Sequence, residues 1–292
     1  MNFIISGLFI FFIVLVGLIP FRLLYVFSDF TRFLLYRVIG YRKKVVDQNL
    51  RQSFPDWDED QLRKVTHNTY KNLTDIFIEG IKTFTLSGKN AAKRYKILNP
   101  ELLEKYYHQN KSIIFVLGHY GNWEWGTLGV PLQVIYDEMV ILYKPLSNQY
   151  IDRYIRKTRS RTGASLVSIY QTAESFKRQK EKPAIFVLVA DQSPGNSKNV
   201  IWTQFLGQDT AFLQGPEKYA TALDLPVIYV DIQRAKRGYY ELELSVLCER
   251  PRELTKGELT KMYAQKLESI IQEHPDDWLW SHRRWKLKRN KK

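Results

Sequence analysis

Cysteine is almost absent from this sequence: Cys248 is the only one in 292 residues. A single cysteine allows no disulfide within the chain, so a reducing compartment suits the protein. Cys248 lies in the strand-like stretch ELELSVLCER, without the neighbours that activate a thiol, and this context indicates a buried, inert side chain. The sequence therefore excludes a disulfide-held scaffold and gives no support to thiol catalysis.

Acidic residues are scarce relative to basic ones, with 30 Asp and Glu against 44 Lys and Arg and a formal net charge of +14. This excess favours an anionic partner, such as nucleic acid, an anionic membrane surface or a phosphorylated or acidic substrate, although a merely soluble basic surface gives the same balance. Hydrophobic residues make up 45% of the chain, which excludes a disordered protein. Internal repeats, Gly/Ser linkers and low-complexity segments are also lacking.

Side-chain charge is missing from residues 1–21, MNFIISGLFIFFIVLVGLIPF, and Arg22 is the first charged residue. The run has about the 20 apolar residues that a membrane-spanning helix needs, and it is apolar on every face. It lacks the basic start and the small-residue cleavage site of a signal peptide, which favours a retained anchor over a cleaved signal. We expect a membrane anchor at residues 1–28, with Pro20 ending or kinking its first helix.

Basic residues follow the apolar run and predict that the rest of the chain lies on the cytoplasmic side of the membrane. They are Arg22, Arg32, Arg37, Arg42, Lys43 and Lys44. Between residues 23 and 41, arginine alternates with apolar residues, as in an amphipathic helix that lies in a membrane interface. We therefore expect residues 29–292 to form one cytoplasmic domain held against the membrane by a single-pass or monotopic anchor.

Short apolar runs alternate with helix-like segments through the remainder of the chain. The runs, which are typical of strands, cover residues 112–118, 138–143, 183–192, 225–234 and 239–247. The last run alternates in hydrophobicity and suits an antiparallel edge strand. Helices are expected at 58–84, 101–109, 149–162, 172–179, 215–223 and 256–272. This order predicts an α/β fold with a mostly parallel central sheet flanked by helices.

Three polar residues, His119, Lys144 and Asp191, each come just after a predicted strand. Ligands of such folds bind beyond the carboxyl ends of the strands, so the three residues predict a shared site. His119 also begins an H-x4-E pattern that ends at Glu124. A turn could bring this carboxylate to one ring nitrogen, fix the tautomer and leave the other nitrogen as a general base. A structural histidine satisfied by a nearby acid is the alternative.

Metal-ligand spacing is lacking. The H-x4-E pattern differs from the H-E-x-x-H arrangement of zinc enzymes, and no other histidine adds a ligand at a suitable spacing. The other histidines are His67, His108, His274 and His282. We therefore expect no metal and no bound cofactor.

Five stretches occur in a fixed order: GHYGNWEWG, YKPLSN, LVADQSPG, FLGQDTAFLQGPEKYA and DDWLWSHRRWK. Together they resemble the bacterial lipid A late acyltransferases, the lauroyl/myristoyl acyltransferases of the lysophospholipid acyltransferase-like superfamily, over nearly the whole chain. The resemblance implies a glycerolipid acyltransferase-like fold at the inner membrane and acyl transfer from an acyl carrier protein thioester to a hydroxyl of a lipid A precursor. An acidic carrier, a phosphorylated acceptor and an anionic membrane all suit the basic charge.

The same resemblance implies roles for the residues of the first motif. His119 would be the general base and Glu124 would orient it. Gly121 and Asn122 complete the motif and would shape the oxyanion region. The chemistry needs no covalent acyl-enzyme, so it requires no nucleophilic serine or cysteine.

Five further positions receive roles from the other motifs and from their charge. Lys144 stands where family members usually have arginine, and it keeps the charge for a phosphate or thioester but loses the bidentate fork. Asp191 and Gln192 match an Asp-Gln pair that supports the site, unless they only cap a turn. Arg153 and Arg161 suit phosphates or an acidic carrier protein, unless they belong to a solvated basic face.

Other interpretations remain open from the sequence. The same chemistry could act on a glycerophospholipid, glycolipid or aminolipid acceptor. A membrane-tethered nucleic-acid-binding protein would also be basic, but no nucleic-acid-binding motif is present. The intact pair of His119 and Glu124 argues against an inactive scaffold. The tryptophans and arginines of DDWLWSHRRWK suit a membrane interface or simple packing of the last segment onto the core.

Overall fold

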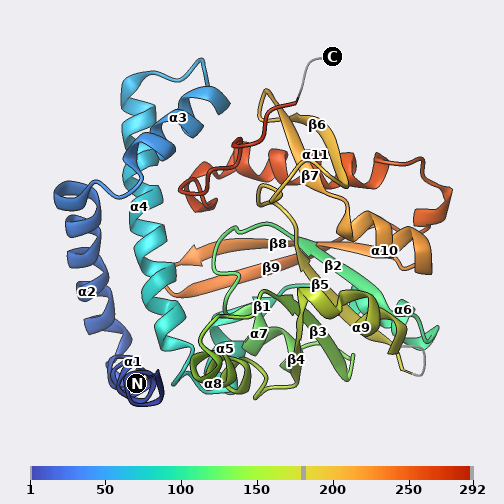
Figure 1. The fold of residues 1–292 in the computed structure, drawn as a ribbon, viewed down its shortest axis with the longest axis horizontal. Coiled ribbons are helices and arrows are strands. Elements are labelled where there is room, and N and C mark those ends of the chain that lie inside the picture. The colour runs from blue at the N-terminus through green and yellow to red at the C-terminus, as the bar shows by residue number, and fades with distance from the viewer. Residues whose placement is uncertain (1, 179–181, 290–292) are drawn as a thin grey trace.

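The computed structural model of the chain describes residues 2–178 and 182–289. A seven-stranded sheet with the order β1-β9-β8-β2-β5-β3-β4 forms its centre (Figure 1). The strands are β1 (Tyr95–Ile97), β2 (Ile113–Leu117), β3 (Glu138–Tyr143), β4 (Ala164–Ser168), β5 (Ala184–Val189), β8 (Val227–Lys236) and β9 (Tyr239–Cys248). Neighbouring strands pair in parallel except in the β8–β9 hairpin. The predicted α/β fold with a mostly parallel central sheet flanked by helices is thereby confirmed.

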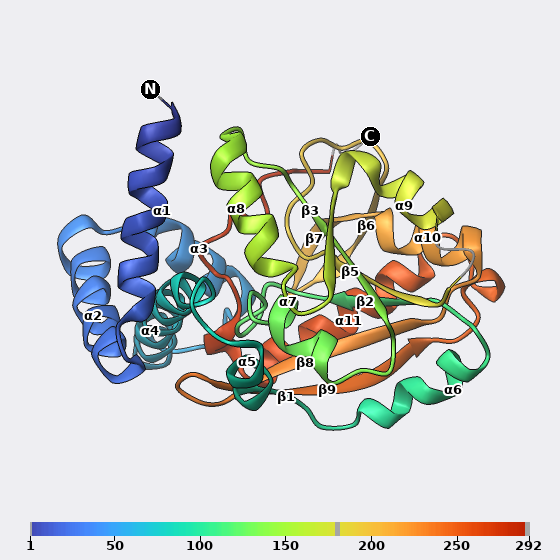
Figure 2. The ribbon, with the colours of Figure 1, turned by 90° about the horizontal axis from the view of Figure 1, so that it is seen from below.

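Helices bury both faces of the sheet. The side chains of β2 alternate between two hydrophobic clusters, with Ile114 and Val116 in one and Phe115 and Leu117 in the other. One helical layer contains α9 (Thr172–Arg178), α10 (Gly215–Leu223) and α11 (Glu258–Glu273), and the other contains α5 (Gly88–Arg94), α6 (Glu104–His108) and α7 (Gly126–Gly129). In Figure 1, α11 lies above β8 and β9 while α5 and α7 lie below them, and in the view from below in Figure 2 α5 and α7 are in front of the strands. Because β2 is buried on both faces, its sequence is a continuous apolar run.

Three further helices are α3 (Lys43–Ser53), α4 (Glu59–Lys82) and α8 (Gln149–Arg159). Helix α3 packs on α4, and α8 packs on the edge strand β4. A capping box between Asp58 and Gln61 starts α4, where the sequence predicts a helix. Asn148 caps α8 by accepting hydrogen bonds from the first backbone N–H groups of that helix.

The apolar N-terminus forms two helices, α1 (Asn2–Leu18) and α2 (Phe21–Phe33), and a π-helical turn continues α2 over Leu34–Ile39. The predicted break at Pro20 separates the two helices, which meet at a bend of 115°. Among the described residues, no single helix has the length and apolar composition needed to cross a bilayer, whereas the bent pair of α1 and α2 together meets that criterion.

The sheet differs from the prediction at its edges. The strand at 239–247 is antiparallel to its neighbour as expected, but β1 pairs with its outer side, so β9 is not an edge strand. The edges are β1 and β4, which the sequence did not predict. A separate antiparallel hairpin of β6 (Val200–Phe205) and β7 (Gln208–Leu213) also escaped prediction.

Candidate active site

The sheet register brings His119 and Asp191 together. Strands β2 and β5 are parallel neighbours, and Leu117 is paired with Val189. Since His119 and Asp191 each follow two residues after this pair, they lie side by side at the carboxyl edge. Gly118 keeps the approach open, because a Cβ there would lie 2.9 Å from a methyl group of Leu267 and 3.4 Å from Asp191 Oδ2.

Asp191 is a buried carboxylate that accepts three hydrogen bonds. Its Oδ1 lies 2.6 Å from His119 Nδ1, and its Oδ2 accepts from the His119 backbone N–H at 2.8 Å and from Trp278 Nε1 at 2.9 Å. Burial opposes the charged form of both partners, but each stabilises the charge of the other. The pKa of His119 is therefore raised and the pKa of Asp191 is lowered from their usual values.

The partner of the imidazole corrects the sequence-based prediction. Asp191 occupies the position beside Nδ1 that we expected Glu124 to take. Glu124 instead forms an ion pair with Arg159 of α8 and acts on His119 only through its field, which raises the pKa of the imidazole. The local chain explains this result, since His119 O accepts a hydrogen bond from Leu279 N and Gly121 turns the backbone away with a φ of +54°.

The second ring nitrogen, His119 Nε2, is available as a proton acceptor. Because Nδ1–H is donated to Asp191, Nε2 of the neutral ring carries the lone pair. The side-chain amide nitrogen of Gln192 lies 3.2 Å from it. Trp123 packs edge-to-face on the imidazole at a centroid distance of 4.9 Å. The ring is thus held on three sides.

A largely apolar cavity of about 680 Å³ is lined by His119. Its walls come from the carboxyl halves of β2, β3 and β5 and from α7, α8 and α10, and include Leu117, Ile141 and Val189. The polar and charged side chains in the lining include His119, Glu124, Lys144, Arg159, Thr127, Thr172 and Gln192. Such a cavity suits an alkyl chain with its reactive end at the histidine.

Gly121 and Asn122, which the resemblance places at the oxyanion region, are not among the residues that line the cavity. A Cβ at Gly121 would lie 3.0 Å from Ile232 O, so the positive φ and the close backbone both require glycine. Asn122 has an exposed fraction of 0%, and its side chain bonds to Glu79 and to the backbone N–H of Trp125. Both residues shape the turn that follows His119.

The two arginines predicted to bind substrate lie outside the cavity. Arg161 donates hydrogen bonds to the carbonyl oxygens of Thr158, Thr83 and Leu86, so it is a structural cation that joins α8 to the end of α4. Arg153 is exposed on the outer face of α8 and lines a separate groove of about 650 Å³. Lys144, by contrast, lines the cavity as predicted.

The C-terminal motif packs against the site. Trp278, Trp280 and Trp285 are buried in the core. Of the two alternatives left open by the sequence, these tryptophans therefore pack onto the core and do not form a membrane interface. His282 Nε2 accepts a hydrogen bond from the backbone N–H of Ser193 at 3.0 Å, next to Gln192. Burial lowers the pKa of His282 to about 4, so the ring is a neutral acceptor. The spacing of His282 in the sequence gave no sign of this contact.

Comparison with known proteins gives consistent matches over most of the chain. Residues 2–287 match the sequence model of a family described as bacterial lipid A biosynthesis acyltransferase. A lipid A biosynthesis acyltransferase of Haemophilus influenzae is 25% identical over 280 residues, which cover 93% of this chain and 84% of that protein. A lipid A biosynthesis lauroyltransferase of Escherichia coli is 22% identical over 86% of this chain and 81% of its own. A palmitoleoyltransferase of the same organism is 20% identical, with coverage of 85% and 79%.

Proposed function

The chain belongs to the bacterial lipid A biosynthesis acyltransferase family and is an O-acyltransferase, and we propose that it transfers a fatty acyl group from an acyl carrier protein thioester to a hydroxyl of a lipid A precursor. The product would be an acyloxyacyl ester. The observation that carries this proposal is the buried Asp191–His119 pair at the wall of a largely apolar cavity.

His119 is the general base of the proposed reaction. Its Nε2 takes the proton of the acceptor hydroxyl while the oxygen attacks the thioester carbonyl. Asp191 holds the ring and stabilises the imidazolium that forms. The tetrahedral intermediate then expels the thiolate, which takes the proton back from His119, so no proton is gained or lost. General base catalysis of this kind contributes about 10²–10⁴-fold.

The polar side chains around the imidazole support this chemistry. The Gln192 amide lies where an acceptor hydroxyl must approach Nε2, so it gives way when substrate binds. Lys144 places positive charge in a cavity that is otherwise largely apolar, whereas the charge of Arg159 is compensated there by Glu124. In such surroundings, a fixed cation stabilises a developing oxyanion or a bound phosphate more strongly than it would in water.

The basic outer face of α8 supports the proposal that the acyl donor is bound to an acidic carrier protein. Arg153, Arg156 and Lys157 follow one another at helical spacing, are exposed and have no acidic partner among the described residues. They line the groove between α8 and the edge strand β4. Arg159, at the end of the same helix, reaches the cavity, so a carrier bound at this groove would deliver its thioester close to the site.

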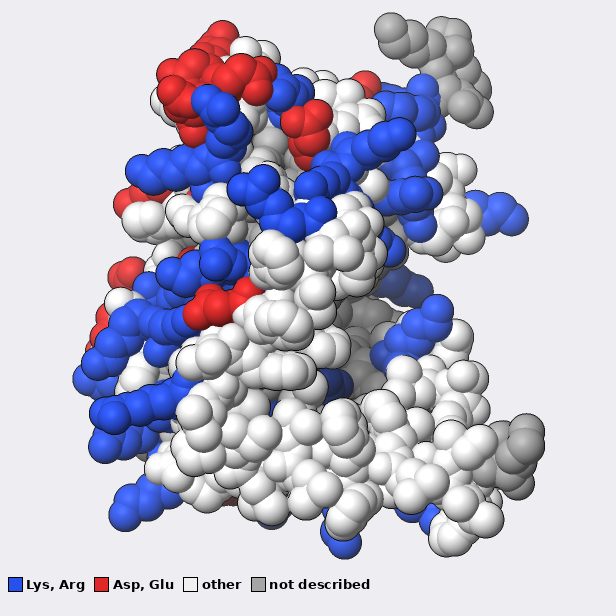
Figure 3. Space-filling model, turned by 90° about the vertical axis from the view of Figure 1, so that its left-hand side faces the viewer, with Lys and Arg blue, Asp and Glu red and all other residues white. Residues whose placement is uncertain are grey.

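The N-terminal helices support attachment to an anionic inner membrane, with residues 1–28 as the anchor and the catalytic domain on the cytoplasmic side. Large apolar side chains are exposed on both helices, among them Phe3, Leu8, Phe12, Leu23, Phe27 and Phe30. Figure 3 shows a surface on this side of the molecule that is largely free of charge in its lower part and has lysine and arginine around it. Apolar area beside basic charge is the composition of an interfacial surface.

The deciding experiment is acyl transfer by the purified protein in detergent micelles. The substrates are a long-chain acyl carrier protein thioester and a tetra-acylated lipid A precursor, and mass spectrometry detects the product. We expect one added acyl group with the wild type and none with His119→Ala. Transfer only to a lysophospholipid, glycolipid or aminolipid would keep the chemistry and change the acceptor. Absence of transfer to any hydroxylated lipid would reject the proposal.

A further inference from the structure

Glu79 is a buried acid in the middle of α4 that the proposed reaction does not use. Its exposed fraction is 1%, and its carboxylate accepts hydrogen bonds from three side chains. These donors are Tyr25 Oη at 2.7 Å, Asn122 Nδ2 at 2.6 Å and Tyr240 Oη at 2.7 Å. A carboxylate buried at this depth is costly unless it is fully hydrogen-bonded, so its position is tightly determined.

Both ends of the turn after His119 are attached to Glu79. Asn122 binds the carboxylate, and Trp125 Nε1 donates to the backbone carbonyl of Glu79 at 3.0 Å. Asn122 Oδ1 also accepts from the backbone N–H of Trp125 at 3.1 Å, which closes the turn. Between these two buried residues, Trp123 and Glu124 face the cavity. Fixing the ends of the turn therefore fixes the two side chains that meet His119 and Arg159.

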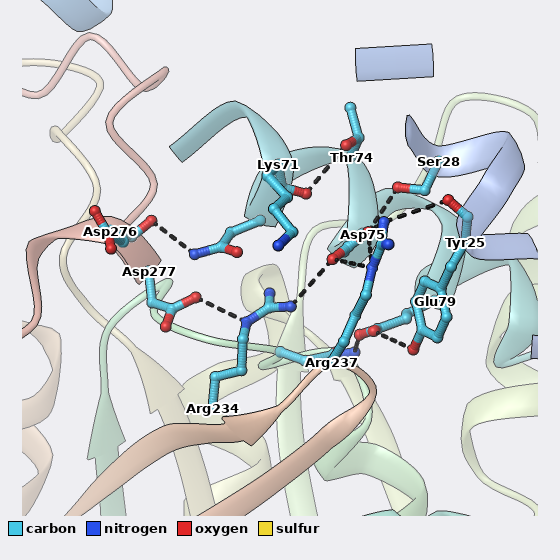
Figure 4. A network of polar contacts seen from close by, with 12 residues as sticks. Tyr25, Ser28, Lys71, Thr74, Asp75, Glu79, Arg234, Arg237, Asp276 and Asp277 are labelled. Carbon is cyan, nitrogen blue, oxygen red and sulfur yellow. Dashed lines mark hydrogen bonds and ion pairs between the residues drawn. The ribbon is translucent and has the colours of Figure 1, made fainter. Parts of the chain in front are cut away.

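The third contact of Glu79 leads to α2. Figure 4 shows Glu79 and Asp75 on α4, with Tyr25 and Ser28 of α2 reaching toward them. Ser28 Oγ donates to Asp75 Oδ1 at 2.7 Å, the same distance as Tyr25 Oη to Glu79 Oε1. Two hydroxyl contacts one helical turn apart thus join α2 to α4, but only the one from Tyr25 reaches the acid that binds Asn122.

We propose that Glu79 is a positioning residue that clamps the turn at 122–125, so that Trp123 packs on His119 and Glu124 pairs with Arg159. Through its hydrogen bond to Glu79, Tyr25 makes this clamp depend on the packing of α2 against α4. The proposal rests on the proposed function for its kinetic test. Its physical basis is that Gln at position 79 replaces an acceptor-only carboxylate with a neutral amide. One of the three donors must then turn and accept instead, and the remaining hydrogen bonds lose the charge that strengthens them, which loosens the turn. A displacement of about 1 Å at a catalytic group can cost about 10²-fold in rate.

The test compares Glu79→Gln and Tyr25→Phe with Ser28→Ala. The control variant removes a hydroxyl contact of equal length between the same two helices and leaves Asn122 bound to Glu79. We expect kcat to fall about 10–100-fold in Glu79→Gln and about threefold to tenfold in Tyr25→Phe, with KM for both substrates nearly unchanged. Ser28→Ala should stay within about twofold of the wild type while losing a similar amount of thermal stability.

A second measurement needs no substrate and separates this proposal from the proposed function. NMR titration of the His119 ring should give a lower pKa in Glu79→Gln and Tyr25→Phe than in the wild type, because the released turn takes the Glu124 charge away from the imidazole. The Ser28→Ala ring should titrate like the wild type. If neither the wild type nor any variant acted as a transferase, this titration would still test whether Glu79 holds the turn at 122–125 in place.

Two results would overturn the proposal. One is equal effects of Tyr25→Phe and Ser28→Ala on kcat and on the His119 titration, which would reduce both contacts to ordinary helix packing. The other is an unchanged His119 titration in a folded Glu79→Gln protein. If that variant did not fold, the comparison of Tyr25→Phe with Ser28→Ala would still give the answer, since each removes only one hydroxyl group.

Discussion

His119 lies between two regions that the chain builds in different ways. On one side is the carboxyl edge of the sheet, where Asp191 follows β5. On the other side is the turn at 121–125, which carries Glu124. Asp191 reaches the imidazole because the pairing of β2 with β5 places it there, and that register follows from strands that are buried on both faces. The turn depends instead on buried polar contacts with α4.

The comparison shows that distance along the chain is a poor guide to which acid holds a histidine. Glu124 is close to His119 in sequence, yet its carboxylate pairs with Arg159. Asp191 is 72 positions away, and its carboxylate binds the ring and the backbone of the same residue. An acid fixed by sheet register stays with the ring as long as the sheet is intact, whereas an acid on a turn is placed by whatever holds the turn.

Asp191→Asn should give the largest effect, because it acts at the sheet edge. The amide cannot accept all three hydrogen bonds that the carboxylate accepts, and the imidazolium loses its counter-charge. We expect kcat to fall about 10²–10⁴-fold in the acyl-transfer assay while the far-UV circular dichroism is retained. Asp209→Asn, at an exposed carboxylate on β7, is the control. Activity within about threefold of the wild type would argue that Asp191 only caps the strand end.

Glu124→Gln should have a smaller effect, because this acid acts on the ring only through its field. We expect kcat/KM to fall about tenfold. The negative charge of Glu124 raises the pKa of His119, so its removal lowers that pKa and leaves the base unprotonated at lower pH. The acid limb of the kcat/KM profile should therefore move to lower pH. A limb that moves to higher pH, or a loss as large as that of Asp191→Asn, would contradict this difference between the edge and the turn.

The sheet edge could be predicted from the sequence because buried parallel strands are continuous apolar runs. Three such runs became β2, β3 and β5, and they placed His119, Lys144 and Asp191 beyond one edge of the sheet. The strands that escaped prediction are short or lie at an edge. Residues 95–97 and 164–168 carry no long apolar run, since an edge strand is covered on fewer sides.

The turn could not be predicted, because its geometry depends on pairs of polar residues far apart in the chain. Glu79 and Asn122 are 43 positions apart, and neither belongs to a periodic pattern that marks burial. The same holds for Trp278, which bonds to Asp191 from a distance of 87 positions. Hydrophobic periodicity reports which face of an element is buried, but it carries no information on which buried polar groups meet.

Reversing the charge on the outer face of α8 should affect carrier binding without affecting the cavity side of the same helix, where Arg159 pairs with Glu124 of the turn. Arg153→Glu combined with Arg156→Glu should raise KM for the acyl carrier protein thioester about tenfold, with kcat nearly unchanged, because Arg159 on the cavity side is intact. The difference in KM between this double variant and the wild type should shrink with added salt, since the Debye length is about 10 Å at 0.1 M.

The matched control for this charge reversal lies at the opposite edge of the sheet. Lys93→Glu combined with Lys96→Glu changes the net charge equally at exposed positions in α5 and β1. If both double variants raised KM alike, net charge alone would explain the effect, and α8 would lose its role as the docking surface.

His282 should give the smallest effect, because it supports the sheet edge from outside. As a neutral ring it accepts the Ser193 N–H and so holds the loop that carries Gln192. His282→Phe keeps a ring but leaves this N–H unpaired, at a cost of about 1–3 kcal/mol in the free energy of unfolding. We expect kcat to fall about threefold. His282→Gln keeps an acceptor and should stay close to the wild type in both kcat and melting temperature. If His282→Phe and His282→Gln behaved alike, the hydrogen bond to Ser193 N–H would be dispensable, and the loop would owe its position to the β5 register that also fixes Asp191.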